Sequence, residues 1–167
     1  MIHVIKSISQ LNIAQLLMVY EESNRKNGSE KYRNYSAERQ LALAEDDLVD
    51  YLRNDFFRQS DAFCGVWVAD GLYKSALRIE SYLDGVLLHA LETAPDARKM
   101  GYAYSLVSSV LEYLRQEGYG VVYSHIHKRN SPSLRLHEKC GFRKITDSAV
   151  LLDGTVTQNT CTMTLTL

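Results

Sequence analysis

The sequence has few cysteines, and they are not spaced as a disulfide or zinc framework. Cys64, Cys140 and Cys161 make an odd count with no C-x-x-C pair, which argues against both kinds of scaffold. The first residues, MIHVIKSISQ, also lack the basic stretch and apolar run of a signal peptide, and no segment reaches the roughly 18 apolar residues of a membrane span. We therefore expect a cytoplasmic protein with three buried thiols and no membrane partner.

The chain is also poor in residues that would divide it or give it one dominant charge. Only two prolines and nine glycines occur in 167 residues, and there is no repeat or low-complexity tract. Lys and Arg number 19 against 20 Asp and Glu, for a net charge of -1, whereas nucleic-acid-binding domains are strongly basic. With 46% apolar residues, the chain can form a packed core. We expect one domain over residues 1–167 and no nucleic-acid partner.

Apolar residues at helical spacing predict four helices. They run from Ser9 to Asn24, from Ser36 to Phe56, from Gly101 to Glu117, and from a Ser131 cap with Pro132 at the first helical position to the residue before Gly141. The polar segment between the first two helices, residues 24–35, is predicted to be a mobile loop.

Runs of β-forming residues predict the strands at residues 2–6, 62–69, 72–83, 86–94, 121–126 and 160–167. Asp-Gly pairs at 70–71 and 84–85 predict tight hairpins. The last run, TCTMTLTL, alternates threonine with apolar residues. A strand of this kind is a pairing hazard if it lies at an exposed edge, so we expect a homodimer that covers it.

These elements predict an α/β (α+β, three-layer) fold. The sheet is expected to be mixed and mostly antiparallel, with about seven strands, flanked by four helices. A strand, a helix and a further strand over residues 86–126 form a central βαβ crossover. We expect the ligand site at the turn between the first strand of this unit and its helix.

An anion site is predicted at that turn. Residues 95–105 contain Gly101 and Ala103 and lead directly into a helix, whose first turn leaves unpaired backbone N–H groups and a partial positive charge. Arg98 and Lys99 add positive charge. Neither G-x-G-x-x-G nor G-x-x-x-x-G-K-[ST] is present, so the chain lacks the usual motifs for binding dinucleotides and nucleoside triphosphates. The loop therefore indicates a different phosphate-bearing ligand.

Two motifs resemble those of one known family. Arg98, Gly101 and Ala103 match a pyrophosphate loop that reads Arg or Gln, two residues, Gly, one residue, Gly or Ala. Downstream, NSPSLRLHEKCGF resembles the family's second signature through Asn130, Ser133, Leu136, Glu138, Lys139, Gly141 and Phe142. The sequence thus resembles the GNAT superfamily of acyl-CoA-dependent N-acyltransferases. Residues 7–60 match by the order of elements.

The resemblance implies a GNAT-like fold, with acetyl-CoA or a related acyl-CoA as co-substrate and no metal. The pyrophosphate would lie on backbone N–H groups of residues 98–104, and the pantetheine arm would pair with the end of the strand at 86–94. The implied cofactor-binding residues are Leu91, Glu92, Thr93, Arg98, Lys99, Met100, Gly101, Tyr102, Ala103, Tyr104, Asn130 and Ser133.

Acyl transfer to an amine needs a base, because an alkyl amine has a pKa of about 10.4 and is protonated at neutral pH. His89 is the first catalytic candidate, since it is the only polar residue in LLHAL and has an ordinary pKa of about 6.5. Glu92 is the second. The structural alternatives are a hydrogen-bonded core histidine and a solvated residue at the strand end.

His137 is the third catalytic candidate. Many members of the family that this sequence resembles hold at its position a tyrosine thought to protonate the departing thiolate, and that tyrosine is missing here. The 3.6-residue period places His137 with Leu134 and Cys140 on the inner side of its helix. An imidazolium can donate a proton as a phenol does, so a general-acid role and a structural hydrogen bond are both open.

Other polar residues are weaker candidates. His125 and His127 share one strand face, but no third ligand at metal spacing accompanies them, so we expect no metal. Candidates for the acceptor pocket are Tyr20, Tyr32, Tyr35, Tyr73, Tyr82, Glu21, Glu22 and Arg78.

The function expected from the sequence is an N-acetyltransferase. It would transfer acetyl from acetyl-CoA to a primary amine of a small molecule or amino-acid derivative, by direct attack in a ternary complex. Two alternatives are a non-catalytic acyl-CoA-binding regulatory module and a peptide or protein N-terminal acetyltransferase.

Overall fold

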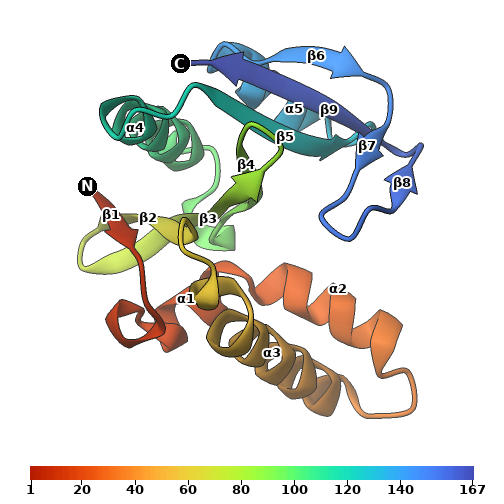
Figure 1. Ribbon diagram of the computed structural model, residues 1–167. Coiled ribbons are helices and arrows are strands. Elements are labelled where there is room, and N and C mark those ends of the chain that lie inside the picture. Colours follow the sequence, from red (N-terminus) through yellow and green to blue (C-terminus); the bar gives the residue numbers. More distant parts are fainter.

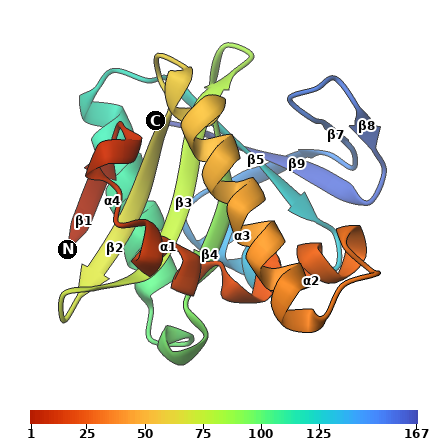
Figure 2. The same cartoon turned by 90° about the horizontal axis from the view of Figure 1, so that it is seen from below.

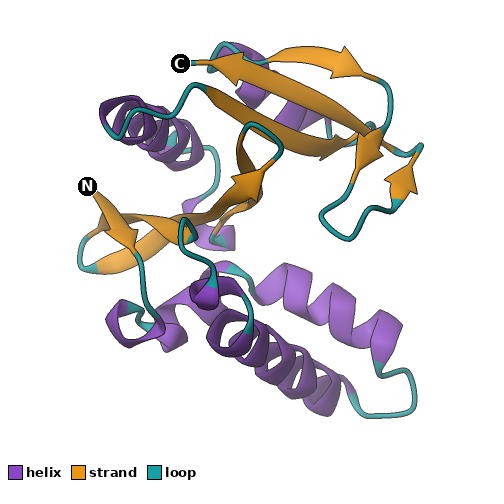
Figure 3. Ribbon diagram, viewed as in Figure 1, coloured by secondary structure: helices purple, strands orange, loops and turns teal.

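The computed structural model describes residues 1–167 and is built from a mixed sheet with helices on both faces (Figures 1 and 3). The α-helices are α1 (Ile13–Val19), α2 (Glu21–Lys31), α3 (Ala37–Asn54), α4 (Tyr102–Gln116) and α5 (Ser131–Lys139). The strands are β1 (Ile2–Ile5), β2 (Phe63–Ala69), β3 (Leu72–Tyr82), β4 (Gly85–Thr93), β5 (Val121–His127), β6 (Arg143–Thr146), β7 (Ala149–Val150), β8 (Val156–Thr157) and β9 (Thr160–Thr166). Single 3-10 turns lie at Ile8–Gln10, Phe56–Arg58 and Pro95–Ala97.

The main sheet has seven strands in the order β1-β2-β3-β4-β5-β9-β6. Every neighbouring pair is antiparallel except β4 and β5, which are parallel and joined by α4. This confirms the mixed, mostly antiparallel sheet and its central βαβ crossover. The fold has five α-helices rather than the predicted four, and a second, two-stranded sheet, β7-β8, that the sequence did not predict.

Two apolar clusters hold the layers together. On one face, α4 packs through Leu106, Val107 and Val110 against buried residues of β3, β4 and β5. On the other face, α1 and α3 pack through residues such as Leu16 and Leu52 against β2 and β3, and α3 runs across this part of the sheet in Figure 2. No helix combines the length and the apolar character that crossing a bilayer requires.

The predicted loop at 24–35 is wrong for most of its length, because residues 24–31 belong to α2. The first predicted helix is instead two helices that meet at Tyr20. Gly28, read as a loop residue, lies in α2 where a Cβ would overlap the backbone carbonyl of Gln40 in α3. The glycine therefore allows the two helices to approach closely, a packing role that local propensity does not reveal.

Three smaller predictions shift by one or two residues. The turn after β3 uses Leu83, at a φ of 50°, and Asp84. Gly85 is the first residue of β4, and a Cβ there would overlap the carbonyl of Val121. The cap of α5 is Asn130 rather than Ser131, since the Asn130 side chain accepts a hydrogen bond from the Ser133 backbone N–H. An amide side chain satisfies this position as well as a hydroxyl does.

The last strand does not lie at a sheet edge, which was the condition for the expected homodimer. β9 is an inner strand that pairs with β5 along Val121–His127 and with β6 on its other side. Its backbone groups are therefore used within the sheet. The expected reason for a homodimer, an exposed edge at residues 160–167, is absent.

Candidate functional site

The parallel strands β4 and β5 separate partway along their length (Figure 2). They pair only at Val86–Val122, Leu87–Tyr123 and Leu88–Ser124. Beyond these positions β4 has a bulge, in which Ala90 and Leu91 lie opposite the single residue Leu77 of β3. Ala90 has a φ of 51°, and its carbonyl accepts a hydrogen bond of 2.6 Å from the hydroxyl of Tyr20. The sheet thus opens a cleft beside the end of β4.

That cleft has a volume of about 600 Å³ and collects most of the predicted cofactor-binding residues. Its lining comprises Leu91, Glu92, Thr93, Arg98, Lys99, Gly101, Ala103, Tyr104, Asn130, Pro132, Ser133 and Leu136. The two predicted residues outside this lining are Met100, which is exposed, and Tyr102, which packs against the core under α1. The two motifs, more than 25 residues apart in sequence, therefore face one cleft.

The loop into α4 has a shape that only glycine adopts without strain. Gly101 caps α4 at a φ of 85°, and no side chain caps the first turn. A Cβ built on Gly101 meets nothing within 4 Å. The first-turn N–H groups of α4 therefore border open space, as a helix N-terminus that receives a phosphate requires.

Arg98 does not project freely from this loop. Its guanidinium forms a two-pronged ion pair with Glu22 of α2, with nitrogen–oxygen distances of 3.1 and 2.5 Å. Both side chains are about half exposed, so the pair adds little stability. It links the helix pair α2–α3 to the cleft. The sequence did not predict this contact.

On the opposite face of the sheet from α4, a polar cluster lies between β3, β4 and β5. Nε2 of His89 is 2.6 Å from Oε1 of Glu80, a carboxylate that is 2% exposed. The second oxygen of Glu80 accepts a hydrogen bond of 2.9 Å from Gln59. His125 of β5 contributes a ring that meets Tyr82 edge-on, with centroids 5.1 Å apart.

Burial lowers the pKa of His89, although the contact with Glu80 works in the other direction. Burial disfavours ionisation of Glu80, but the contacts with His89 and Gln59 outweigh it and lower the pKa of this carboxyl. At neutral pH His89 is therefore neutral and Glu80 is ionised. A proton on Nε2 would face the carboxylate and leave Nδ1 as a proton acceptor.

Glu92 lies in the cleft itself. Burial is the main reason that the pKa of Glu92 is raised. Its backbone carbonyl accepts a hydrogen bond of 2.5 Å from the hydroxyl of Ser75, which ties the end of β4 to β3. The position suits contact with a ligand in the cleft.

His137 faces inward as predicted but is enclosed, with 1% of its surface exposed. Its Nε2 is 3.1 Å from the Ser124 hydroxyl, and its Nδ1 is 2.8 Å from the Ser133 carbonyl. Burial lowers the pKa of His137, so the ring is neutral. With both nitrogens engaged and no open path to the cleft, this geometry favours the structural alternative over a general acid.

The other acceptor-pocket candidates divide into two groups. Tyr20, Tyr82 and Arg78 lie beside the His89–Glu80 cluster. The rest are engaged elsewhere: Tyr32 donates to Asp47, Tyr35 is exposed, Tyr73 accepts from the Asn12 backbone, Glu21 pairs with Arg25, and Glu22 pairs with Arg98.

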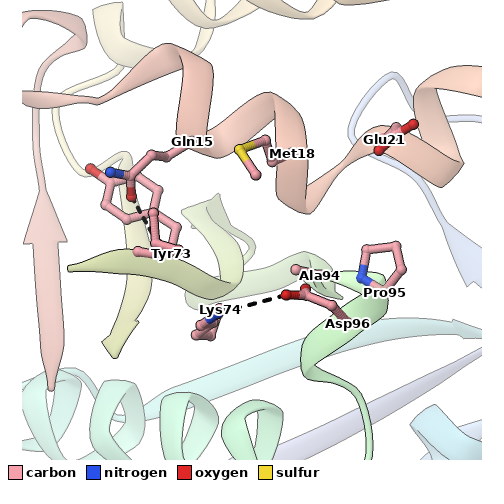
Figure 4. Close-up of a pocket in the computed structure, with 9 residues that line it drawn as sticks. Gln15, Met18, Glu21, Tyr73, Lys74, Ala94, Pro95 and Asp96 are labelled. Carbon is pink, nitrogen blue, oxygen red and sulfur yellow. Dashed lines mark hydrogen bonds and ion pairs between the residues drawn. The ribbon is translucent and has the colours of Figure 1, made fainter. Parts of the chain in front are cut away.

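Two further hollows flank the sheet on the side of α1–α3. One, of about 570 Å³, lies between α2, α3 and Arg78 of β3. The other, of about 220 Å³, lies under α1 at the far end of β3 (Figure 4). Its polar groups already have partners, because Gln15 accepts from the Tyr73 backbone and Lys74 pairs with Asp96. This smaller hollow therefore offers little for catalysis.

No three His, Cys, Asp or Glu side chains gather in an arrangement that could hold a metal ion. His125 and His127 share a strand but differ in surroundings: His125 is half-buried against Tyr82, and the exposed His127 accepts a hydrogen bond from the Arg129 backbone.

Sequence reasoning missed Glu80, Asn24 and the part that His125 plays beside His89. A signal for Glu80 was available. Arg78, Glu80 and Tyr82 alternate with the buried Leu77 and Ile79 along β3, so the strand carries polar residues on a face that a helix covers. Asn24 gave no signal, because it stands at the boundary between the first predicted helix and the predicted loop.

Comparisons with known proteins agree with this geometry. The model of the Acetyltransferase (GNAT) family matches residues 29–142. A segment of 88 residues is 33% identical to GCN5-related N-acetyltransferase 6, chloroplastic, of Arabidopsis thaliana, and covers 53% of this chain but only 30% of that protein.

Solved structures share the fold. PaiA N-acetyltransferase of Thermoplasma acidophilum, in complex with coenzyme A, superposes with a TM-score of 0.66 at 16% identity, over 100% of this chain and 99% of that one. Ribosomal-protein-alanine N-acetyltransferase of Brucella melitensis gives 0.66 at 18% identity, over 100% and 99%.

Proposed function

The chain belongs to the GNAT acetyltransferase family, and from this premise we propose that it transfers the acetyl group of acetyl-CoA to a primary amine of a small molecule or amino-acid derivative. The observation that carries the proposal is the cleft at the end of β4. There an uncapped helix start and an interrupted strand meet, and His89, a partly buried histidine whose pKa is lowered, precedes the cleft residues on the same strand.

The residues of the cleft fit an acyl-CoA. Backbone N–H groups at the start of α4 would hold the pyrophosphate, and the open space at Gly101 admits it. The end of β4, at Leu91, Glu92 and Thr93, would hold the pantetheine arm, with Asn130 and Ser133 on the other wall. When bound, the co-substrate supplies a thioester as acyl donor.

His89 is proposed as the general base. An amine acceptor with a pKa of about 10.4 must lose a proton before it attacks. Nδ1 of His89 would accept that proton, and the ionised Glu80 beside Nε2 would stabilise the resulting imidazolium. Glu92 is the second candidate for this role, since burial raises its pKa toward neutrality.

Backbone groups of the β4 bulge are proposed to polarise the thioester carbonyl. The bulge turns Ala90 and Leu91 out of regular pairing with β3, and a backbone N–H in such a place can meet developing negative charge. The new carbon–nitrogen bond forms as the carbon–sulfur bond breaks, and the thiolate takes a proton from water or from the His89 imidazolium.

Steady-state assays with acetyl-CoA and a panel of small amines, amino-acid derivatives and N-terminal peptides test this function. We expect acceptor-dependent release of free thiol, together with an acetylated amine in the mass spectrum. A reaction without acceptor corrects for hydrolysis.

Two outcomes would replace the proposal. Tight acetyl-CoA binding without thiol release above background would favour a regulatory acyl-CoA-binding module. Turnover confined to peptides would favour an N-terminal acetyltransferase. The compartment and the oligomeric state stay predictions from the sequence.

A further inference from the structure

The larger hollow on the α2–α3 side contains buried hydrogen-bond donors without partners. Its volume is about 570 Å³, and its walls come from α2, α3 and β3. The lining residues are Asn24, Asn27, Glu30, Lys31, Ala44, Asp47, Leu48, Tyr51 and Arg78. Two of them, Asn24 and Arg78, carry buried nitrogens with no hydrogen-bond partner.

Arg78 is held by aromatic rings rather than by a carboxylate. Its guanidinium carbon lies 5.8, 5.2 and 6.0 Å from the ring centroids of Tyr20, Tyr51 and Phe56. Its Nε is buried without a partner. The nearby Glu80 has Oε1 at 2.6 Å from Nε2 of His89, and its other oxygen accepts a hydrogen bond from Gln59. Stacking orients the guanidinium while leaving its donors for another group.

Asn24 supplies the second donor. It is 4% exposed, and its Nδ2 has no partner. Buried side-chain donors are nearly always paired, because removing them from water without a hydrogen bond is costly. Two such donors on one cavity form a site that a ligand with oxygen acceptors would complete.

The charged residues of the rim do not occupy the buried donor of Arg78. Lys31 pairs with Asp47 at 2.6 Å, and Tyr32 donates to the same carboxylate at 2.6 Å. Glu30 is on an exposed turn of α2. The ionised Glu80 is the buried carboxylate near Arg78, but its oxygens face His89 and Gln59, and it forms no hydrogen bond with Arg78. The donors of Arg78 therefore stay open to an oxygen acceptor of a ligand.

The position of Arg78 relates this site to the proposed reaction. Arg78 on β3 and His89 on β4 are register partners, and partners of this kind have Cβ atoms about 5 Å apart. An anionic group bound at Arg78 would thus lie only a few bonds from an amine that gives its proton to His89.

We propose that the cavity between α2 and α3 binds a carboxylate of the acceptor through Arg78 and Asn24, so that the substrates are amines that also bear a carboxylate, as amino acids do. The inference rests on the proposed acetyl transfer and narrows its acceptor. A guanidinium and an amide NH₂ together match the two oxygens of a carboxylate.

Pairs of acceptors that differ only in the carboxylate test this subsite. Amino acids and their C-terminal amides are assayed pairwise with acetyl-CoA, together with amines that carry a phosphate in place of the carboxylate. We expect kcat/KM to favour the acids over the amides by about ten- to hundredfold, the range for a hydrogen-bonded charge. Phosphate-bearing amines preferred over acids would overturn the carboxylate assignment.

Substitutions at Arg78 and Asn24 test whether the preference for acids over amides arises at this cavity. Arg78→Gln is expected to abolish the preference for acids over amides by raising KM for the acids, with the affinity for acetyl-CoA unchanged; Arg78→Lys should restore part of the preference. Arg143→Gln, an exposed arginine on β6, is the charge-matched control and should behave as the unaltered protein. If Arg78→Gln fails to fold, Asn24→Asp tests the site, since its carboxylate would repel the ligand.

Calorimetry separates this inference from the proposed function. N-acetyl amino acids, the products expected, are titrated into the full chain with coenzyme A present. Binding that Arg78→Gln removes supports the subsite even if no amine in the panel is acetylated. Acetylation of amides as efficiently as acids would overturn the subsite and leave acetyl transfer standing, and absence of product binding would also overturn it.

Discussion

The two sides of the candidate site are built from different parts of the chain. The cofactor side is a continuous segment, residues 98–104, whose donors are backbone N–H groups shaped by Gly101. The acceptor side takes Asn24 from α2, Arg78 from β3 and His89 from β4, and its donors are side chains. One side depends on backbone conformation and the other on tertiary packing.

This difference separates the features that the candidate site can share with other members of the family from those that belong to this chain. Backbone donors do not depend on side-chain identity, so a loop with a few fixed small residues can bind the same anion in many proteins. Side-chain donors brought together by packing change with each substitution. Acceptor choice should therefore be altered on the α2–α3 side without disturbing the loop at Gly101.

The largest effect is expected from His89→Gln, which alters the acceptor side only. Positioned bases contribute about 100- to 10,000-fold, so kcat should fall by that factor while affinity for acetyl-CoA is retained. Steady-state kinetics and calorimetry measure the two quantities. An unchanged kcat would exclude His89 as the base and leave Glu92 as the candidate.

A change beneath the acceptor cavity should weaken the fold. Gly28→Ala places a Cβ against the Gln40 carbonyl. Alanine gains about 1 kcal/mol in helix propensity, but overpacking costs about 1–3 kcal/mol. Because the clash is with a backbone atom, the cost should lie at the upper end, so we expect a net loss of about 2 kcal/mol in the free energy of unfolding. Urea unfolding measures it.

Gly120→Ala is the control for this prediction, because a Cβ there meets nothing within 4 Å. Equal stability of the two variants would mean that α2 and α3 are not in close contact at Gly28.

The cofactor side is tested by Gly101→Ala. Alanine disfavours the left-handed backbone at a φ of 85°, so the loop should lose its open shape and acetyl-CoA should bind about tenfold more weakly, or about 1.4 kcal/mol. The KM of the acceptor should not change.

Gly118→Ala is matched to this variant, since Gly118 also has a φ of 85° and open space around it but lies at the other end of α4. It should carry the same strain without loss of acetyl-CoA affinity. If both variants lost acetyl-CoA affinity equally, the loss would come from a less stable fold and not from the loop at Gly101.

The smallest effect expected is a shift in the pH profile. Burial holds the pKa of His89 below its usual value of about 6.5, and the groups facing it are Glu80, Arg78 and His125. Activity should be full at pH 7 and fall as the pH drops through this lowered pKa. Glu80→Gln removes the contact that raises the pKa of His89, so the acid limb should move to lower pH. If the acid limb did not move, Glu80 would have no influence on the pKa of the group that acts as the base.

The sequence predicted the lining of the cleft at the end of β4 better than the surroundings of His89. Arg98, Gly101 and Asn130 were named because they match two sequence motifs, and all three line this cleft. The α2 helix was missed because its residues are polar and include Gly28, whose value lies in contact with Gln40 of another helix. His89 was found, but its partner Glu80 comes from a neighbouring strand whose register no local pattern specifies.

The inner position of β9 has a consequence for how the chain is made. Its neighbours β5 and β6 both leave the ribosome before it, yet β6 pairs with β9 rather than with β5. The half of the sheet beyond β5 therefore waits for residues 160–166 to be synthesised, while β1 to β4 can already associate. Until then β5 presents an unpaired edge, so the sheet becomes continuous from β1 to β6 only when β9 inserts between β5 and β6.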